Sequence, residues 1–261
     1  MSSKRAGLKS SSTPNSHREI WRRFSDGKPE YLVCHYWWAY LWHWGVWFFD
    51  HQPIINAILF GQYKTLSHRA LHNCMQDRPA GRLLQLTCAY GSMTPSLVAA
   101  MDDELYLMDV AEIQLDATQK KVPEADKKRL LSAQMNAESL AYGNDVFATV
   151  LMFFLLHELP PDARDRSINE AIRVLRPGGR FIITEYGASP KRNWLWRFRP
   201  TRLLLQWLEP FLESFWQLDL LCLLQERAKT QGKVIKQVDE FQCFFGFYRV
   251  CIFELDLADS T

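Results

Sequence analysis

The stretch LLQLTCAYG, residues 83–91, could form a nucleotide-binding turn at the end of a buried strand. Such a turn needs small residues, because they let backbone N–H groups approach a ligand closely. Thr87, Ala89 and Gly91 stand where three small residues are expected, although Thr87 and Ala89 are not suited to a positive φ angle. Gln85 stands where an acid often accepts a hydrogen bond from a cofactor's amino acid moiety. Taken alone, the stretch is explained nearly as well by a buried strand that ends in a tight turn.

An acid follows this loop at a distance that suits a nucleoside ligand. Asp109 ends the next apolar run, ELYLMDV, 18 residues after Gly91. A carboxylate offers two acceptor oxygens side by side, and these can bind both hydroxyls of a ribose. Alternatively, Asp109 caps the turn that follows it. The combination of loop and acid favours an adenosine cofactor.

Apolar runs alternate with helical patterns between residues 80 and 187. We expect strands at RLLQLTCAY and ELYLMDV, a helix followed by a short third strand within LDATQKKVPEADKKRLLSAQMN, a fourth strand at FATVLMFFLLHEL and a fifth at RFIITEYG. Helices are expected at 94–101, with Thr94 as its cap, and at 161–179, which ends in a glycine pair. A helical segment at 200–230 precedes two closing strands, FQCFFGFYRV and CIFEL. Continuous apolar strands separated by helices indicate an α/β fold with a mostly parallel sheet covered on both faces.

Two aromatic-rich segments flank this core, and together they hold most of the ten tryptophans. Residues 30–60 contain HYWWAYLWHWGVWFF and are predicted to form two or three short helices. Residues 191–208, KRNWLWRFRPTRLLLQWL, interleave basic and aromatic side chains, a mixture that suits a membrane surface. Such a mixture can also stack on nucleic-acid bases, but no base-reading module accompanies it. A lid helix over an apolar pocket with a basic rim is a further interpretation.

Composition limits the remaining function classes. The net charge of +2 gives no global field for nucleic acid, and no apolar run is long enough to predict a transmembrane helix. The six cysteines lack metal-site spacing and are expected to be free thiols in a reducing compartment. Residues 1–28 are basic and serine-rich, which is typical of a disordered tail, and they lack the apolar stripe of a transit peptide. We expect one domain over residues 29–261, comprising a helical lid (29–78), a cofactor-binding core (80–190), a helical insertion (191–235) and closing strands (238–256).

The order of these motifs resembles that of the class I S-adenosylmethionine methyltransferases. The carriers of the resemblance are LLQLTCAYG, LYLMDV, LLHEL after the fourth strand and LRPGG before RFIITEYG. The nearest branch is that of the ubiquinone/menaquinone methyltransferases. HYWWAYLW, DHQPIINAILFGQY, FFLLHELPP and GFYRV are similar to the methyltransferase-like proteins of rhodoquinone biosynthesis (RquA type). The resemblance covers about residues 31–253 and implies a Rossmann-like class I methyltransferase fold: a mostly parallel seven-stranded sheet flanked by helices, N-terminal aromatic helices and a helical lid insertion.

The chain departs from the methyltransferase pattern at two places. The loop has Gln85, Thr87 and Ala89 instead of an acid and glycines, and the fourth strand starts with Phe147-Ala148 instead of Phe-Asp. The resemblance implies that ubiquinone becomes rhodoquinone when an amino group from S-adenosylmethionine replaces a ring methoxy group, assisted by manganese. Neutral Gln85 would then ease deprotonation of the cofactor's ammonium, because an acid that stabilises the charge is missing. An ordinary methyltransferase acting on a quinone precursor and a non-catalytic member of the fold are the alternatives.

The resemblance also implies a set of site residues. His157 and Glu158 after the fourth strand and Glu185 after the next are expected to be manganese ligands or acid–base groups, although either glutamate could cap a helix. Tyr90 is a further catalytic candidate, or a packing residue. The expected cofactor-binding residues are Gln85, Thr87, Ala89, Gly91, Asp109, Asn136 and Ala137, and the expected substrate-binding residues are His35, Trp37, Trp38 and Tyr186.

Partners and location follow from the same resemblance. Ubiquinone is a bilayer lipid, so the implied enzyme contacts a membrane peripherally and has no nucleic-acid partner. It would lie on the cytoplasmic face of the inner membrane in a bacterium, or on the matrix side in a mitochondrion.

Overall fold

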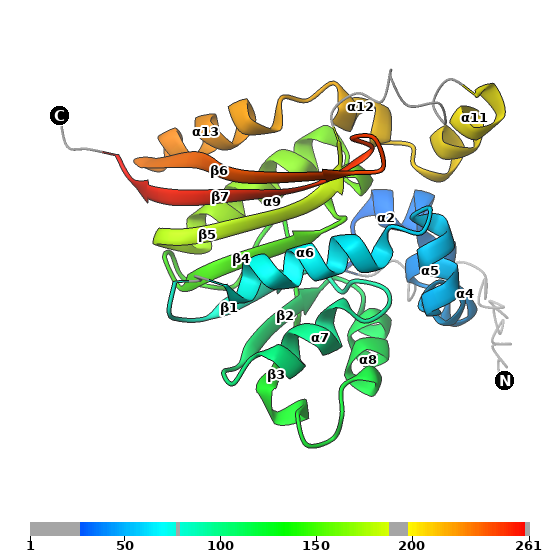
Figure 1. Ribbon diagram of the computed structural model, residues 1–261, viewed down its shortest axis with the longest axis horizontal. Coiled ribbons are helices and arrows are strands. Elements are labelled where there is room, and N and C mark those ends of the chain that lie inside the picture. The colour runs from blue at the N-terminus through cyan, green and yellow to red at the C-terminus, as the bar shows by residue number, and fades with distance from the viewer. Residues whose placement is uncertain (1–26, 77–78, 188–197, 259–261) are drawn as a thin grey trace, which may run out of the picture.

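The computed structural model describes residues 27–76, 79–187 and 198–258 and contains one seven-stranded sheet in the order β3-β2-β1-β4-β5-β7-β6 (Figure 1). All neighbours are parallel except β7, which is antiparallel to β5 and β6. The predicted mostly parallel seven-stranded α/β sheet is therefore confirmed. The strands are β1 Leu83–Leu86, β2 Leu105–Asp109, β3 Leu130–Gln134, β4 Phe147–Phe153, β5 Leu175–Tyr186, β6 Lys233–Cys243 and β7 Tyr248–Leu257.

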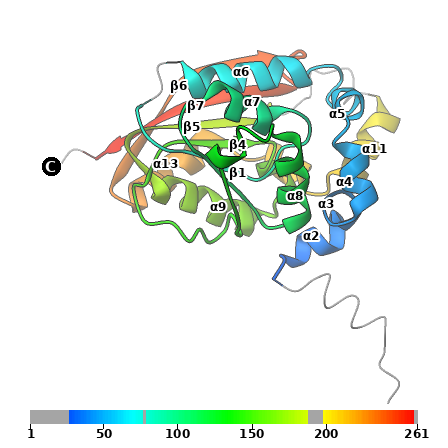
Figure 2. The same cartoon turned by 90° about the horizontal axis from the view of Figure 1, so that it is seen from below.

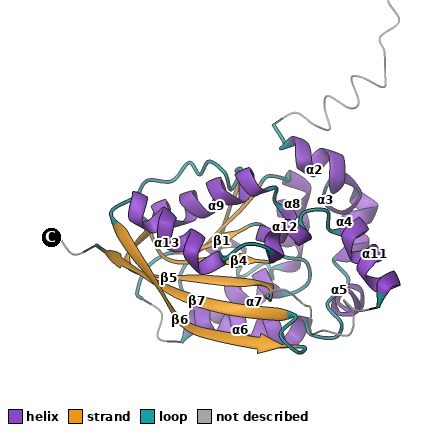
Figure 3. Cartoon of the chain, turned by 90° about the horizontal axis from the view of Figure 1, so that it is seen from above, coloured by secondary structure: helices purple, strands orange, loops and turns teal. Residues whose placement is uncertain are grey.

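Helices cover both faces of the sheet, which is why every residue of β1 and β4 is buried (Figures 2 and 3). One face carries α6 and α7, and α9 packs with α13 on the other. The burial of apolar strand residues between these layers forms the main core of the protein. The helices are α6 Tyr63–Met75, α7 Met93–Ala100, α8 Glu112–Lys121, α9 Pro161–Val174 and α13 Leu220–Thr230.

In the described part of the chain before α6, from residue 27 on, there are four short helices, where two or three were predicted for residues 30–60. They lie with α11, Arg199–Leu208, beyond the end of the sheet where β4 and β5 finish (Figures 1 and 2). Gly45 allows two of them to meet, because a Cβ atom there would lie 1.8 Å from the carbonyl oxygen of Trp38. The four helices are α2 Glu30–His35, α3 Trp37–Tyr40, α4 His43–Phe49 and α5 Gln52–Ile58.

Two strand boundaries differ from the prediction, one near the predicted site at the end of β4 and one at the start of β5. Strand β4 stops at Phe153, and a 3-10 turn, Leu156–Glu158, follows, so the predicted strand was too long. The reason is Phe154, whose φ of 57° breaks the extended conformation. Helix α9 ends at Val174 and LRPGG opens β5 instead of closing the helix, since Pro177 has no N–H to continue helical bonding.

Other boundaries also needed correction. Thr94 does not cap α7, which begins at Met93; its hydroxyl instead donates to Gln85 Oε1. Strand β6 begins at Lys233, inside the segment predicted to be helical, and a turn around Gly246 splits the predicted run FQCFFGFYRV.

Three further predictions concern the chain as a whole. The predicted tail lies almost wholly outside the described residues, as do Trp194 and Trp196 of the second aromatic segment. All six cysteines are free thiols, as their spacing predicts. Within the described ranges, no helix has the length and apolarity needed to cross a bilayer.

Candidate active site

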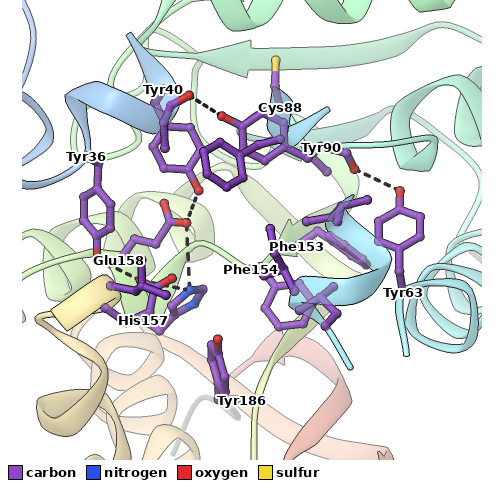
Figure 4. A pocket seen from close by; sticks show the side chains of 18 of the residues that line it. Tyr36, Tyr40, Tyr63, Cys88, Tyr90, Phe153, Phe154, His157, Glu158 and Tyr186 are labelled. Atoms are coloured by element: carbon purple, nitrogen blue, oxygen red, sulfur yellow. Dashed lines mark hydrogen bonds and ion pairs between the residues drawn. The ribbon is translucent and has the colours of Figure 1, made fainter. Parts of the chain in front are cut away.

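Two cavities that share lining residues lie under the N-terminal helices, at the carboxyl ends of β1, β2 and β4, and Figure 4 shows the larger of these two. The first, which we call the Asp109 cavity, has a volume of about 70 Å³ and lies beside β2. The second, which we call the aromatic cavity, has a volume of about 160 Å³ and is walled mainly by tyrosine, phenylalanine and aliphatic side chains. Five residues line both cavities: Tyr36, Tyr40, Cys88, Phe154 and Glu158.

Asp109 is fixed at the end of β2 as the sequence predicts. Its Oδ2 accepts a hydrogen bond from the Cys88 N–H at 2.8 Å, and its Oδ1 accepts one from the Ala111 N–H at 2.8 Å. Burial raises the pKa of Asp109 to about 6, although these backbone donors lower it. The carboxylate is therefore mostly ionised at pH 7, and each oxygen keeps acceptor capacity for a ligand hydroxyl. Asn136 and Ala137 line the same cavity.

Thr87 adopts the conformation for which it was judged unsuited. Its φ is 71°, in the left-handed region that favours glycine, and such a conformation costs about 1–3 kcal/mol for another residue. The N–H of Thr87 donates to Met108 O at 2.9 Å, and its own carbonyl accepts from Gln85 Nε2 at 3.0 Å. These two bonds hold the strained turn in place beside the Asp109 cavity.

Gln85 supports the loop from behind. The side chain is wholly buried, and its Oε1 accepts from the Thr94 hydroxyl at 3.1 Å while its Nε2 binds the Thr87 carbonyl. It belongs to the lining of neither cavity. The geometry therefore gives Gln85 a structural task in the loop, instead of the direct cofactor contact that the sequence predicts.

The rest of the loop is held by side chains from the N-terminal helices. The Tyr63 hydroxyl accepts from the N–H groups of Ser92, at 2.8 Å, and Met93, at 3.0 Å, and donates to the Tyr90 carbonyl at 3.0 Å. The Gly91 N–H donates to Asp50 Oδ1 at 2.9 Å. Three N–H groups at the start of α7, which could otherwise bind an anion, are thus already occupied.

Gly91 is required where it stands. Its φ is 78°, and a Cβ atom there would lie 2.7 Å from the Tyr63 hydroxyl oxygen. Lys121 completes the arrangement, since its ammonium donates to the Gly91 carbonyl at 2.9 Å and pairs with Asp50 at 2.6 Å. The sequence prediction missed Asp50, Tyr63 and Lys121. The only signal was that Asp50 and Tyr63 are the first and last residues of the stretch DHQPIINAILFGQY.

Tyr90 connects the cofactor loop (residues 83–91) to the N-terminal helix α3. Its ring stacks on Tyr40 at 5.4 Å with an interplanar angle of 11°. Its hydroxyl donates to the Ala39 carbonyl at 2.6 Å and accepts from Gln114 Nε2 at 3.0 Å. Burial raises the pKa of Tyr90 well above its usual value. With both hydrogen-bonding roles used, the geometry favours a positioning role for Tyr90 over the acid–base role first considered.

A buried network of proton-carrying groups lies beside the aromatic cavity, and Glu158 is the member that also lines the Asp109 cavity (Figure 4). His157 Nδ1 lies 2.9 Å from Glu185 Oε2. On the other side of the ring, Nε2 lies 3.9 Å from Glu158 Oε1 and 3.8 Å from Glu209 Oε2. Glu209, at the end of α11, was missed because nothing in the sequence indicates its contact with His157.

The protonation of this network follows from its burial and its charges. Burial lowers the pKa of His157, but the Glu185 carboxylate and its hydrogen bond outweigh that effect and raise it to about 9. Burial raises the pKa of Glu158 to about 8, against the lowering effect of the His157 cation. Burial also raises the pKa of Glu209. At pH 7 the site therefore holds a histidine cation and a protonated Glu158.

Tyrosines from the lid complete the network. The Tyr36 hydroxyl donates to Glu209 Oε2 at 3.1 Å, and the Tyr40 hydroxyl donates to Glu158 Oε1. Burial raises the pKa of each tyrosine well above its usual value, so both act as neutral donors at pH 7. These hydrogen bonds orient Glu158, which lines both cavities. Its carboxyl group is placed to protonate a ligand bound in either of them.

The predicted manganese ligands do not form a ligand set. Glu185 faces Nδ1 of His157, whereas Glu158 faces Nε2, so the two carboxylates lie on opposite sides of the ring. Across the described parts of the chain, no group of three His, Cys, Asp or Glu side chains is placed to hold a metal ion. The acid–base interpretation of His157 and Glu158 fits this geometry, and the ligand interpretation does not.

The predicted substrate-binding residues divide into two pairs. Trp38 and Tyr186 line the aromatic cavity, as does Ala89 from the loop. His35 and Trp37 do not line it: His35 is exposed with its ring against Phe211, and Trp37 is exposed beside Trp42. The first pair is consistent with substrate contact, and the second pair lies on the outer surface of the lid.

Comparisons with known proteins agree with the fold. Residues 83–179 match the model of a methyltransferase domain family. The chain is 26% identical over 136 residues to the ubiquinone/menaquinone biosynthesis C-methyltransferase UbiE of Vibrio parahaemolyticus, covering 51% of this chain and 52% of that protein. It is 30% identical over 139 residues to the demethylmenaquinone methyltransferase of Symbiobacterium thermophilum, covering 52% and 55%. The chain thus spans about half the length of the curated relatives it matches.

The similarity in three dimensions extends further along the chain. The N-methyltransferase NodS of Bradyrhizobium japonicum, solved in complex with S-adenosyl-L-homocysteine, aligns over 92% of this chain and 97% of its own, with a TM-score of 0.52 and 13% sequence identity. At that identity the likeness concerns the fold alone. Together these findings show a class I methyltransferase fold, a match of residues 83–179 to a methyltransferase domain family, and a distant relation in sequence to the ubiquinone/menaquinone methyltransferases.

Proposed function

We propose that this protein is a transferase that uses S-adenosylmethionine to modify a quinone ring, and that its reaction converts ubiquinone to rhodoquinone. The observation that carries the proposal is the position of Glu158, a buried acid that lines both the Asp109 cavity and the aromatic cavity. The names of the curated relatives support a quinone as the substrate class.

The ribose of the cofactor is assigned to the Asp109 cavity, because a volume of about 70 Å³ is too small to enclose the whole of S-adenosylmethionine. Asp109 accepts both ribose hydroxyls, and Asn136 and Ala137 lie beside the adenine. When bound, S-adenosylmethionine supplies the group that is transferred. Its reactive end lies toward Cys88 and Glu158, since these residues line both cavities.

The quinone ring is assigned to the aromatic cavity. A volume of about 160 Å³ is close to the size of an apolar protein cavity that binds benzene, so it accommodates one six-membered ring. Tyr186, Phe154 and Trp38 offer ring faces and edges for stacking. The protonated Glu158 then donates to a quinone carbonyl oxygen, which makes the ring carbons more electrophilic.

The amino transfer is supported by the loop that S-adenosylmethionine would approach. The N–H groups of Gly91, Ser92 and Met93 are taken by Asp50 and Tyr63, so they offer no donors to the cofactor's carboxylate. The amino acid moiety must therefore take another position, and we place its nitrogen toward the ring. Buried, neutral Gln85 adds no negative charge that would keep this nitrogen protonated.

The reaction balances in two parts. The amino nitrogen bonds to the ring carbon, and the methoxy group leaves with a proton as methanol. The bond between nitrogen and the α-carbon is then cleaved with water, as the α-carbon is oxidised to a ketone and the ring takes up the electron pair. The step therefore releases rhodoquinone in its reduced, hydroquinone form. The resemblance also implies manganese, but since the described residues form no ligand group, we assign it no step. Polarisation of the carbonyl is assigned to Glu158 instead.

Methyl transfer to a quinone precursor is the second candidate, favoured by the activity for which the relatives are named. Mass spectrometry of the product separates the two: exchange of methoxy for amino supports our proposal, and gain of a methyl group supports the alternative. Purified protein that binds S-adenosylmethionine but turns over neither quinone would be a non-catalytic member of the fold.

The role of Glu158 is tested by Glu158→Gln, which keeps the shape of the side chain but cannot transfer a proton. We expect turnover to fall by about 10²- to 10⁴-fold with cofactor affinity unchanged. Glu213→Gln is the matched control, because Glu213 lies on the exposed side of α12, Leu212–Trp216. Equal turnover of both variants would contradict the proposed role.

A further inference from the structure

We infer that helices α3, α4, α5 and α11 form a docking face for an anionic lipid bilayer, from which the substrate ring enters the aromatic cavity. The inference rests on the proposed function, because it gives a lipid quinone its route to the site. We call this surface the docking face. It lies at the end of the molecule opposite the C-terminus (Figures 1 and 3).

The docking face exposes an unusual amount of aromatic surface. Trp44 is 66% exposed, Trp47 is 58% exposed and Trp207 is 75% exposed. Large apolar side chains normally lie inside a protein, and a cluster of exposed ones marks a surface that meets something else. Further exposed apolar side chains on or next to the same helices are Trp37, Trp42, Phe48, Ile58, Phe198 and Leu203.

The charge of the docking face suits the bilayer. The four helices contain His43, Arg199 and Arg202 but no aspartate or glutamate. Two acids directly follow these helices in the sequence: Asp50 is paired with Lys121, and Glu209 faces His157. A cationic surface rich in tryptophan matches the headgroup region of a membrane with anionic lipids, where indole rings and basic side chains are both favoured.

The docking face is continuous with the aromatic cavity. Trp38 of α3, Ile58 of α5 and Leu208 of α11 line the cavity. Their neighbours Trp37 and Trp207 face outward from the same helices. The same short helices therefore separate the cavity from the docking face, so a ring leaving the bilayer crosses only this layer.

A second copy of the chain fits this surface less well. A two-fold dimer brings the same patch of both copies together. Arg199 would then approach its own counterpart without any acid on the four helices to compensate. We therefore commit to the bilayer, and self-association is an outcome of the test.

Vesicle flotation tests the docking face. The full chain is mixed with vesicles of phosphatidylcholine alone, or of phosphatidylcholine with phosphatidylglycerol. We expect binding to both, and stronger binding to the anionic vesicles. The triple variant Trp44→Ser, Trp47→Ser, Trp207→Ser is expected to bind at least tenfold more weakly. The control Leu257→Ser removes a side chain that is 61% exposed at the far end of β7, and it is expected to bind like the native protein.

Charge is tested separately with Arg199→Gln. We expect about a fivefold loss of binding to the anionic vesicles and little change with phosphatidylcholine alone. Equal binding of native protein and triple variant would overturn the inference. So would sedimentation showing that the native protein self-associates and the triple variant does not.

Activity separates this inference from the proposed function. The triple variant should keep native turnover of a short-tailed quinone in solution and lose most turnover of ubiquinone embedded in vesicles. Vesicle binding without turnover of either quinone would sustain the docking face and reject the proposed function. If a folded triple variant loses turnover of the short-tailed quinone as well as of vesicle-embedded ubiquinone, these tryptophans do more than dock the protein, and the inference is rejected.

Discussion

Removal of the Tyr63 hydroxyl should both destabilise the protein and loosen the cofactor loop. The hydroxyl accepts from the N–H groups of Ser92 and Met93 and donates to the Tyr90 carbonyl. Helix α7 has no side-chain cap of its own at Ser92, so Tyr63 provides its cap from another helix. Tyr63→Phe keeps the ring, which is almost wholly buried, and removes these bonds together with the hydroxyl's interactions with the side chains of Ser92 and Gln52.

The magnitude follows from the groups left behind. An unsatisfied buried polar group costs about 1–3 kcal/mol, and three backbone groups lose their partner here. Ser92 and Tyr90 are only partly buried and can recover some hydration, so we take the lower end for each. We expect the free energy of unfolding to fall by about 3 kcal/mol.

Urea denaturation followed by circular dichroism measures this change. Tyr106→Phe is the control, since its hydroxyl reaches only Glu104 at the surface, and we expect a change below about 0.5 kcal/mol. The affinity for S-adenosylmethionine, measured by calorimetry, should fall about tenfold in Tyr63→Phe because the loop beside the cavity is no longer held, which corresponds to about 1.4 kcal/mol. If Tyr63→Phe unfolds at the same urea concentration and with the same slope as the native protein, the loop is not held as we describe.

Three other predictions concern protonation and strain. Turnover should fall as pH rises through about 8, because Glu158 must be protonated to act as an acid; a pH–rate profile that rises through this range would contradict that role. The pKa of His157 is raised from 6.5 to about 9, so its contribution to stability is complete below about pH 6.5 and is lost as pH rises to 9, by up to about 1.4 kcal/mol per pH unit. His157→Gln should flatten this part of the stability profile measured by urea denaturation, and an unchanged slope would show that His157 is not its cause. Thr87→Gly should raise the stability by about 1 kcal/mol, because relief of the positive φ exceeds the added entropy of the unfolded chain; a lower melting temperature would refute strain at Thr87.

Strong local patterns were enough to predict the sheet and the position of Asp109. The apolar runs of β1 and β4 are buried on both faces, which leaves few alternatives to a central parallel strand. Asp109 was predictable because the end of β2 lies next to the end of β1 in any such sheet. His157 and Glu185 were brought together by the same reasoning, since β4 and β5 are neighbours.

Contacts between distant segments were not predictable from local patterns. Tyr63 and Asp50 satisfy the loop from 27 residues or more away, and Glu209 reaches His157 from an insertion outside the sheet. The conformation of Thr87 was misjudged because β-branched residues avoid positive φ, and only the surrounding bonds make it tolerable here. The arrangement around His157 was also beyond local patterns, because adjacency on the sheet does not fix which nitrogen of His157 each carboxylate faces.

The most direct test follows the nitrogen of the cofactor. The protein is incubated with ubiquinone and S-adenosylmethionine that carries a nitrogen isotope label in its α-amino group, and the quinone product is examined by mass spectrometry. We predict that the label appears on the ring in place of a methoxy group, and that Asp109→Ala abolishes both the label and cofactor binding. Unlabelled product that has gained a methyl group, or cofactor binding that survives Asp109→Ala, would contradict the account.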